Sequence, residues 1–256
     1  MSKITMDSII KGVETVPLVT IIHGKESVGK TYMACQSDSP IMLDMEHGAE
    51  IHPIQKIPLY GKDVVFDDCI EALRLIYAQH KHMGVKTVIV DSFDWVQKLI
   101  HKEVCSKKNV ETIDELKWGA GYQLAASLAQ DFVNGLDSLR QLGLEIIIIC
   151  HTQIVKVDEP IHDLYEIYDL KLDRLIRNNL KEWSTIIAFC EFQQSTHLKG
   201  ERFGQKMYKA ISTGDRIMHT VPQAGFVAKS RIPIPSPLPL DWKIFQQEIN
   251  KARKGE

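Results

Sequence analysis

Short apolar runs alternate with helix-like stretches along most of the chain. The runs Thr87–Asp91 (TVIVD) and Glu145–Cys150 (EIIIIC) are β-branched and apolar, which is typical of strands buried on both faces. Further strands are expected at Pro17–His23, Ile41–Asp44 and Thr185–Phe192. Strands separated by helices predict an α/β fold, in which a mostly parallel central sheet carries helices on both faces. One long helix is expected from an apolar stripe of Leu124, Leu128, Phe132, Leu136 and Leu139.

A proline-rich segment, Pro233–Pro239 (PIPSPLP), ends this alternation. Proline has no backbone N–H to donate, so the segment is expected to run as an extended tail that continues neither a sheet nor a helix. A short helix is expected at Asp241–Asn250. The predicted organisation is therefore a single domain over residues 1–232, followed at 233–256 by a proline-rich tail and a short C-terminal helix.

The composition narrows the possible functions. The chain has 256 residues, 44% hydrophobic and 25% charged, which excludes disorder along its whole length. Its 31 basic and 33 acidic residues give a net charge of −2. Domains that bind nucleic acid through their overall charge carry a basic excess, so any contact with nucleic acid must come from a local patch.

Signals for export or for a membrane are missing from the sequence. Residues 1–17 lack the apolar core of roughly 7–15 residues that a signal peptide needs. No stretch approaches the roughly 20 apolar residues that span a bilayer. The five cysteines are scattered without a C-x-x-C pair, which argues against disulfides and a zinc site. We therefore expect a cytoplasmic protein with no membrane partner.

The segment after the first expected strand matches the phosphate-binding pattern G-x-x-x-x-G-K-[ST]. Its glycines let the backbone wrap around phosphates, and amides at the start of the next helix point at the anion. In this pattern Lys30 reaches the β- and γ-phosphates, and the Thr31 hydroxyl binds Mg²⁺. We predict a site for ATP and Mg²⁺ formed by Gly24, Lys25, Glu26, Ser27, Val28, Gly29, Lys30 and Thr31.

Asp91, at the end of a buried strand, is the second candidate ligand of Mg²⁺, although an aspartate there can also cap the next helix. The next residue is Ser92 and not glutamate, so no catalytic base follows the metal ligand directly. Either the chain is a kinase, whose substrate hydroxyl replaces water, or the base lies elsewhere. Glu46, within Asp44–Gly48 at the same expected sheet edge, is the candidate base, and a solvated loop carboxylate is the alternative.

Two further positions carry candidate chemistry. Gln153 follows the strand at 145–150 and is a candidate sensor of the γ-phosphate. His151 can do the same, but a histidine at a strand end is more often a structural hydrogen-bonding group. Lys229 and Arg231 alternate and would share one face of a strand, where they can stabilise charge on a transferring phosphate in their own or a neighbouring subunit. A solvated basic pair is the alternative.

Together these motifs resemble the RecA-family ATPases, and more narrowly the phage-encoded RecA-like proteins that include the short Sak-type ATPases of single-strand annealing. The resemblance rests on Gly24–Thr31, Ile41–Gly48, Val88–Ser92, Thr152–Ile154 and Ala228–Pro233. It implies a RecA-like P-loop NTPase core that hydrolyses ATP with Mg²⁺. It also implies that Glu46 activates water, that Gln153 senses the γ-phosphate, and that Lys229 and Arg231 reach into the adjacent subunit's site in a ring or filament.

The resemblance further implies single-stranded DNA as a partner, in phage recombination or replication and in the host bacterial cytoplasm. The candidate DNA-binding residues follow Asp91 and Gln153: Lys102, Lys107, Lys108, Lys156, Lys171, Arg174, Arg177 and Lys181, with Tyr165 and Tyr168 available to stack on bases. Solvated faces are the alternative, because acidic residues are interleaved with the second set. Bacterial RecA has separate oligomerisation and DNA-gathering domains that this chain lacks, so full strand exchange is not expected.

Two other functions remain open on the sequence alone. A P-loop kinase of a small metabolite would explain Ser92, although no arginine-rich lid follows the fourth strand. A nucleotide-gated adaptor would load a partner such as a single-strand-binding protein or a helicase, with the proline-rich tail as a docking segment.

Overall fold

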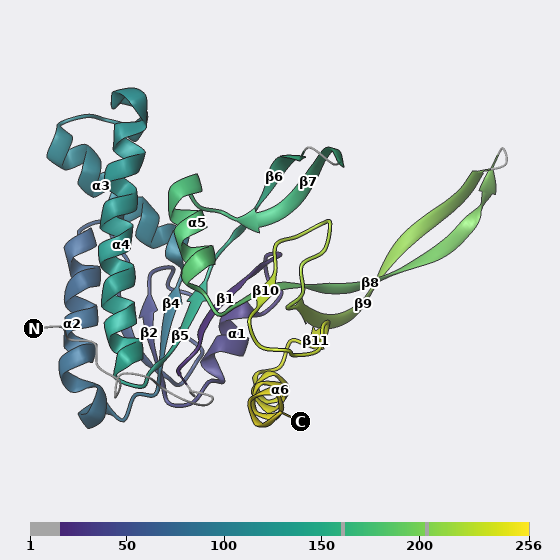
Figure 1. The fold of residues 1–256 in the computed structure, drawn as a ribbon, viewed down its shortest axis with the longest axis horizontal. Coiled ribbons are helices and arrows are strands. Elements are labelled where there is room, and N and C mark those ends of the chain that lie inside the picture. Colours follow the sequence, from purple (N-terminus) through teal and green to yellow (C-terminus); the bar gives the residue numbers. More distant parts are fainter. Residues whose placement is uncertain (1–15, 160–161, 203–204, 256) are drawn as a thin grey trace, which may run out of the picture.

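A mostly parallel sheet runs through the centre of the molecule (Figure 1). The computed structural model describes residues 16–159, 162–202 and 205–255. Over these residues the main sheet has nine strands, eight of them in the order β11-β9-β8-β1-β5-β4-β2-β3, with β10 paired to β8. Its parallel strands are β1 (Val19–Gly24), β2 (Pro40–Asp44), β3 (Gln55–Pro58), β4 (Thr87–Asp91), β5 (Glu145–Ile149) and β8 (Ile186–Arg202).

Helices cover both faces of this sheet (Figure 1). One face packs against α2 (Phe66–Met83), α3 (Phe93–Lys108), α4 (Ala120–Gln141) and α5 (Arg174–Trp183). The other face packs against α1 (Lys30–Cys35) and α6 (Trp242–Lys254). Two short 3₁₀ turns, η2 (Ile113–Glu115) and η3 (Lys117–Gly119), connect α3 to α4. The predicted α/β fold of a P-loop NTPase is confirmed.

The alternation of side chains along each strand divides the core into two layers. Ile21 and Val90 contribute to the core beneath α2–α5, whereas Ile22 and Ile89 contribute to the core beneath α1 and α6. Because both layers are apolar, the strands read as continuous hydrophobic runs, and this is why the sequence predicted them correctly. The predicted stripe of α4 is buried at Phe132, Leu136 and Leu139, whereas Leu124 in its first turns is exposed.

Two antiparallel hairpins project from the edge of the sheet where β5 and β8 leave it, and the sequence did not predict them. The first pairs β6 (Thr152–Glu159) with β7 (His162–Leu170) as a separate two-stranded sheet. The second is a long arm formed where β8 runs on past the sheet and pairs with β9 (Gln205–His219), as Figure 1 shows. The expected strand at 185–192 is therefore only the first part of β8.

The proline-rich segment rejoins the sheet, so the expectation that it stays outside is wrong. Within it, β11 (Leu238–Pro239) pairs antiparallel with Met218 and Ile217 of β9. Proline is tolerated there because β11 is an edge strand, which needs no N–H on its outer side, and Leu238 is buried. The predicted C-terminal helix is confirmed as α6, whose first turn is capped by the Asp241 carboxylate accepting from the Ile244 N–H at 3.0 Å.

All five cysteines are free thiols, in agreement with the prediction of no disulfides. Over the described part of the chain, no helix combines the length and apolar character needed to cross a membrane. The segment on which the lack of a signal-peptide core was predicted, residues 1–17, lies outside the described residues except for its last two positions.

Candidate active site

The phosphate loop connects β1 to α1 and passes tightly against β8. Gly24 has φ of +139°, and a Cβ there would lie 2.0 Å from the Cys190 carbonyl oxygen of β8. Only glycine fits this position, because both the backbone angle and the close approach exclude a side chain. Gly29, with φ of +98°, ends the loop as the N-cap of α1.

Lys30 lies buried inside the loop that precedes it. Its ammonium donates to the carbonyl oxygens of Gly24 at 3.1 Å and Lys25 at 2.9 Å. Burial lowers the pKa of Lys30 below its ordinary value. The loop therefore holds a desolvated cation at the point where the pattern predicts the β- and γ-phosphates.

Thr31 and Asp91 meet at the carboxyl edge of the sheet, as predicted. The Thr31 hydroxyl donates to an Asp91 carboxylate oxygen at 2.7 Å. Burial raises the pKa of Asp91 to about 6, and the nearby carboxylates of Glu46 and Asp44 add to the rise. A hydroxyl beside an under-compensated carboxylate is a donor set that suits Mg²⁺, which prefers oxygen ligands. These two residues fit the predicted metal site.

Glu46 is held by Ser92, which occupies the position after Asp91 where a catalytic glutamate was looked for and not found. The Ser92 hydroxyl, immediately after Asp91, donates to the Glu46 carboxylate. The same carboxylate lies 3.6 Å from His151 Nδ1. Ser92 thus positions the candidate base, which lies in the loop after the neighbouring strand β2.

Asp94 is a site residue that sequence reasoning missed. Its carboxylate accepts from the His151 ring at 2.7 Å and from the His151 backbone N–H at 3.0 Å. The hydrogen bond to Asp94 raises the pKa of His151. Burial acts to raise the pKa of Asp94, but the two bonds from His151 outweigh it and lower that pKa. This charge-assisted pair orients the imidazole toward Glu46, and the ligand atoms of Glu46, Asp94 and His151 all lie within 4.8 Å of one another.

One cavity of about 460 Å³ joins these groups. The phosphate loop and α1 form one wall, and Glu46, Asp91 and His151 line the cavity as well. Tyr32 and His52 also line it, with their ring centroids 5.9 Å apart. The structure therefore brings together the residues predicted for phosphate, metal and water activation.

Gln153 does not reach this cavity. Its amide donates to the carbonyl oxygens of Leu170 at 3.0 Å and Leu172 at 3.3 Å, and so ties β6 to the end of β7. His151, at the end of the preceding strand, lines the cavity instead. On the sequence alone, Gln153 was the stronger candidate for sensing the γ-phosphate.

Lys229 and Arg231 lie at the opposite edge of the sheet from the phosphate loop. Lys229, on β10 (Lys229–Ser230), pairs with Ile187 near the start of β8, whereas Gly24 pairs with Cys190 farther along that strand. Lys229 donates to the Ser184 carbonyl at 2.7 Å, and Arg231 donates to the Glu182 carbonyl at 2.6 Å. Within this chain both cations therefore bind carbonyl oxygens at the end of α5.

Arg216 reaches the phosphate loop from β9 and had no signal in the sequence. Its Nη1 lies 2.6 Å from the point that a Cβ at Gly29 would occupy, and its guanidinium carbon is 5.9 Å from the Tyr32 ring centroid. The side chain is exposed and forms no ion pair with any carboxylate in the described parts of the chain. A strand that went unpredicted thus supplies a cation beside the site.

The candidate DNA-binding residues differ in how free their charges are. Arg177 and Lys181 are both within ion-pair distance of Asp169, at 3.4 and 2.6 Å, and Lys107 pairs with Glu103 at 2.9 Å. Lys102 lines a second cavity beside Glu46. Arg177 and Lys181 of α5 thus hold Asp169 of the β6–β7 hairpin.

A parallel sheet with a phosphate loop after β1 and a buried aspartate at the end of β4 defines the class of P-loop NTPases. A family model described as an AAA domain matches residues 17–232. The chain belongs to this AAA domain family of P-loop ATPases. A search of curated proteins finds no match.

Proposed function

We propose that the protein is a Mg²⁺-dependent ATPase that acts with single-stranded DNA in phage recombination or replication. The observation that carries the ATPase part is the single cavity in which Lys30, Thr31, Asp91 and Glu46 meet. On this proposal Lys30 and the loop amides bind the phosphates, while Thr31 and Asp91 hold Mg²⁺, which neutralises charge on the phosphates.

Glu46 serves as the general base in this proposal. Its carboxylate, held by Ser92, accepts a proton from the attacking water, and the imidazole held by Asp94 lies beside it. His151, which faces the cavity, takes over the γ-phosphate sensing first assigned to Gln153. Gln153 then passes the change on to the β6–β7 hairpin through its bonds to Leu170 and Leu172.

Glu46→Gln is the variant that tests the base. The amide keeps the shape of the side chain but cannot take a proton, so ATP binding is retained while turnover falls by at least about a hundredfold. Lys30→Ala is the companion variant and loses ATP binding as well. Binding is measured with a fluorescent ATP analogue and turnover by phosphate release. Normal turnover by Glu46→Gln would remove the assignment.

The DNA partner, the assembly and the location follow from the resemblance to RecA-like phage proteins. We propose a ring or filament in the host bacterial cytoplasm, in which Lys229 and Arg231 leave the carbonyls of α5 and reach the neighbouring site. A single-strand-binding protein is a candidate partner of the same assembly. Turnover measured with and without single-stranded DNA, at two salt concentrations, tests the partner, because phosphate contacts weaken steeply with salt. ATP binding with negligible turnover, with or without DNA, would favour an adaptor.

A further inference from the structure

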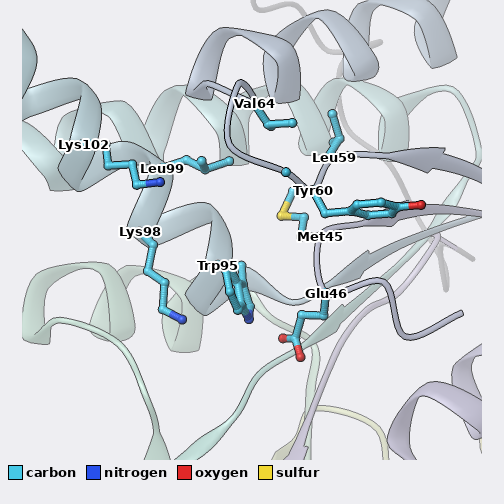
Figure 2. Close-up of a pocket in the computed structure, with 10 residues that line it drawn as sticks. Met45, Glu46, Leu59, Tyr60, Val64, Trp95, Lys98, Leu99 and Lys102 are labelled. Carbon is cyan, nitrogen blue, oxygen red and sulfur yellow. The ribbon is translucent and has the colours of Figure 1, made fainter.

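A second cavity lies against the first and shares Glu46 with it. It encloses about 220 Å³ between the loop after β2, the loop after β3 and the first turns of α3. Figure 2 shows the Glu46 carboxylate beside Trp95 at one end of this cavity, with Met45 between them and Tyr60. Whatever occupies the second cavity therefore lies next to the group proposed to activate water.

The walls combine aromatic and apolar surface with positive charge. Met45, Leu59 and Leu99 are buried, while Trp95 and Tyr60 present partly exposed rings. Lys98 and Lys102 come from the same side of α3 and border the cavity (Figure 2). Aromatic surface with adjoining lysines is the combination that binds a base together with its backbone phosphates.

Both lysines are free to take a ligand's charge. In the parts of the chain that the structure describes, neither forms an ion pair, whereas Lys107 on the same helix pairs with Glu103 at 2.9 Å. Lys98 Nζ lies over the Trp95 ring, 3.6 Å from its centroid, so a cation–π contact holds this cation against one face of the aromatic surface. Two exposed, unpaired cations on successive turns of a helix are complementary to successive phosphates.

We infer that this cavity binds one base of a single-stranded nucleic acid, with flanking phosphates on Lys98 and Lys102. The volume is below the roughly 300–1,000 Å³ of a site for a drug-sized ligand, so it suits one ring system and leaves the sugar and phosphates at the mouth. Trp95 provides the stacking surface, and the base takes the place of the Lys98 ammonium, which moves to a flanking phosphate. The Glu46 carboxylate accepts a hydrogen bond from an N–H of the base, which every base carries on its pairing edge.

The inference deepens the proposed function, because it places the DNA contact at Glu46 itself. A base that bonds Glu46 competes with Ser92 and His151 for the same carboxylate, so strand binding changes the turnover rate. The effect on turnover rests on the proposed role of Glu46, whereas binding of the strand does not.

Fluorescence anisotropy of a labelled oligo(dT) on the full chain, with an ATP analogue present, tests the site. Trp95→Ala weakens binding about tenfold, and Trp95→Phe, which keeps a ring, retains most of it. The double variant Lys98→Ala with Lys102→Ala makes the negative slope of log affinity against log salt shallower by about 1.4, the change expected when two phosphate contacts on a single strand are lost. Lys243→Ala, which removes an exposed lysine of α6, is the matched control and changes neither quantity.

Competitors identify what the cavity recognises. An abasic oligomer of equal length must compete poorly, and equal competition would overturn the base pocket. Free dTMP that competes as well as the strand would make a mononucleotide the ligand, and polyglutamate that does so would make it an acidic peptide; either result overturns the proposal. Phosphate release without DNA is measured in parallel, so a chain that binds DNA through this cavity but never hydrolyses ATP refutes the ATPase and not the site.

Discussion

At the scale of single residues, the position after Asp91, the candidate magnesium ligand, is the most informative. Serine there leaves the end of β4 without a candidate base, but its hydroxyl donates to the carboxylate of Glu46, which lies in the loop after β2. The candidate base and its support therefore follow two adjacent strands, whose ends are kept in register by the pairing of Asp44 with Asp91. Glu46 and Ser92 are far apart along the chain, but the pairing of β2 with β4 brings them together.

Arg216 gives a prediction at this scale. Its guanidinium lies beside Gly29 without a carboxylate partner in the described residues, so we expect it to bind a phosphate oxygen of ATP. Arg216→Ala should weaken ATP affinity about tenfold, the effect of losing a charge-assisted hydrogen bond. Isothermal titration with a non-hydrolysable analogue measures this. Arg74→Ala, which removes an exposed arginine of α2, is the control, and equal affinities for the two variants would count against the contact.

His23 gives a second prediction, on stability. The ring is buried; its Nε2–H donates to the Val227 carbonyl at 2.8 Å, and Nδ1 accepts from the Thr152 hydroxyl at 2.8 Å. Burial lowers the pKa of His23 to about 4. The unfolded chain therefore binds a proton more tightly, so stability is complete above the unfolded pKa of about 6.5 and falls by up to about 1.4 kcal/mol per pH unit down to about pH 4.

Urea unfolding at pH 7 and pH 4.5 measures this loss. His23→Gln keeps a donor and an acceptor but no titrating ring, so its acid destabilisation should be smaller than that of the native chain. His82→Gln, at an exposed position of α2, should leave the acid loss unchanged. Identical pH dependence in the His23 variant and the native chain would rule out His23 as the source.

Residue patterns predicted the central strands and identified Lys30, Thr31, Asp91 and Glu46, which meet in one cavity, because apolar runs and a spaced motif are local properties. Asp94 and Arg216 were missed because each acts on a group far along the chain, and only the fold brings them there. Gln153 was expected in the cavity on the basis of its order in the sequence. Strand alternation decides otherwise, since a strand begins at Thr152 and Gln153 bonds to β7.

At the scale of elements, the β6–β7 hairpin is fixed at its base from two directions. The Gln153 amide bonds Leu170 and Leu172, and the Val227 N–H donates to the Tyr168 carbonyl at 2.9 Å. The base of the hairpin is therefore closed by Gln153 and attached to the segment before β10. Antiparallel pairing of this kind escaped prediction because its polar, partly exposed strands lack a continuous apolar run.

Gln153→Ala tests whether this attachment transmits the nucleotide state. We expect faster amide hydrogen exchange at the ends of β6 and β7 and loss of DNA-stimulated turnover, while ATP affinity stays within about twofold because the side chain lies outside the cavity. Gln130→Ala on the exposed face of α4 is the control. Full DNA stimulation in the Gln153 variant would show that the hairpin is not coupled through this side chain.

At the scale of the whole molecule, the net charge of −2 gives no general attraction to a long polyanion, and Arg177 and Lys181 of α5 both lie within ion-pair distance of Asp169. DNA binding must therefore come from local groups of basic residues, and repeated copies of the chain would multiply those contacts. Lys229 and Arg231 belong to the same scale, because in one chain they only bind the carbonyls at the end of α5.

Mixing two impaired variants tests the assembly. Arg231→Ala keeps its own phosphate loop, and Lys30→Ala keeps its Arg231, so a mixed assembly contains sites with both groups if Arg231 acts on a neighbour. We expect each variant alone to be at least about tenfold slower than the native chain and the mixture to recover turnover. Phosphate release across mixing ratios measures this. No recovery, in an assembly shown by light scattering to be mixed, would restrict Arg231 to its own chain.

The short link between β5 and the hairpin has a mechanical consequence. Only Cys150 and His151 separate the end of β5 from the start of β6, and the Lys171 N–H returns to the His151 carbonyl at 3.0 Å. The β6–β7 hairpin can thus pivot about His151, which lines the candidate active site. A rotation of about 10° at His151, carried along eight strand residues of about 3.3 Å each, would move the far end by about 5 Å. A change at one phosphate would be amplified into a displacement comparable to the spacing between strands.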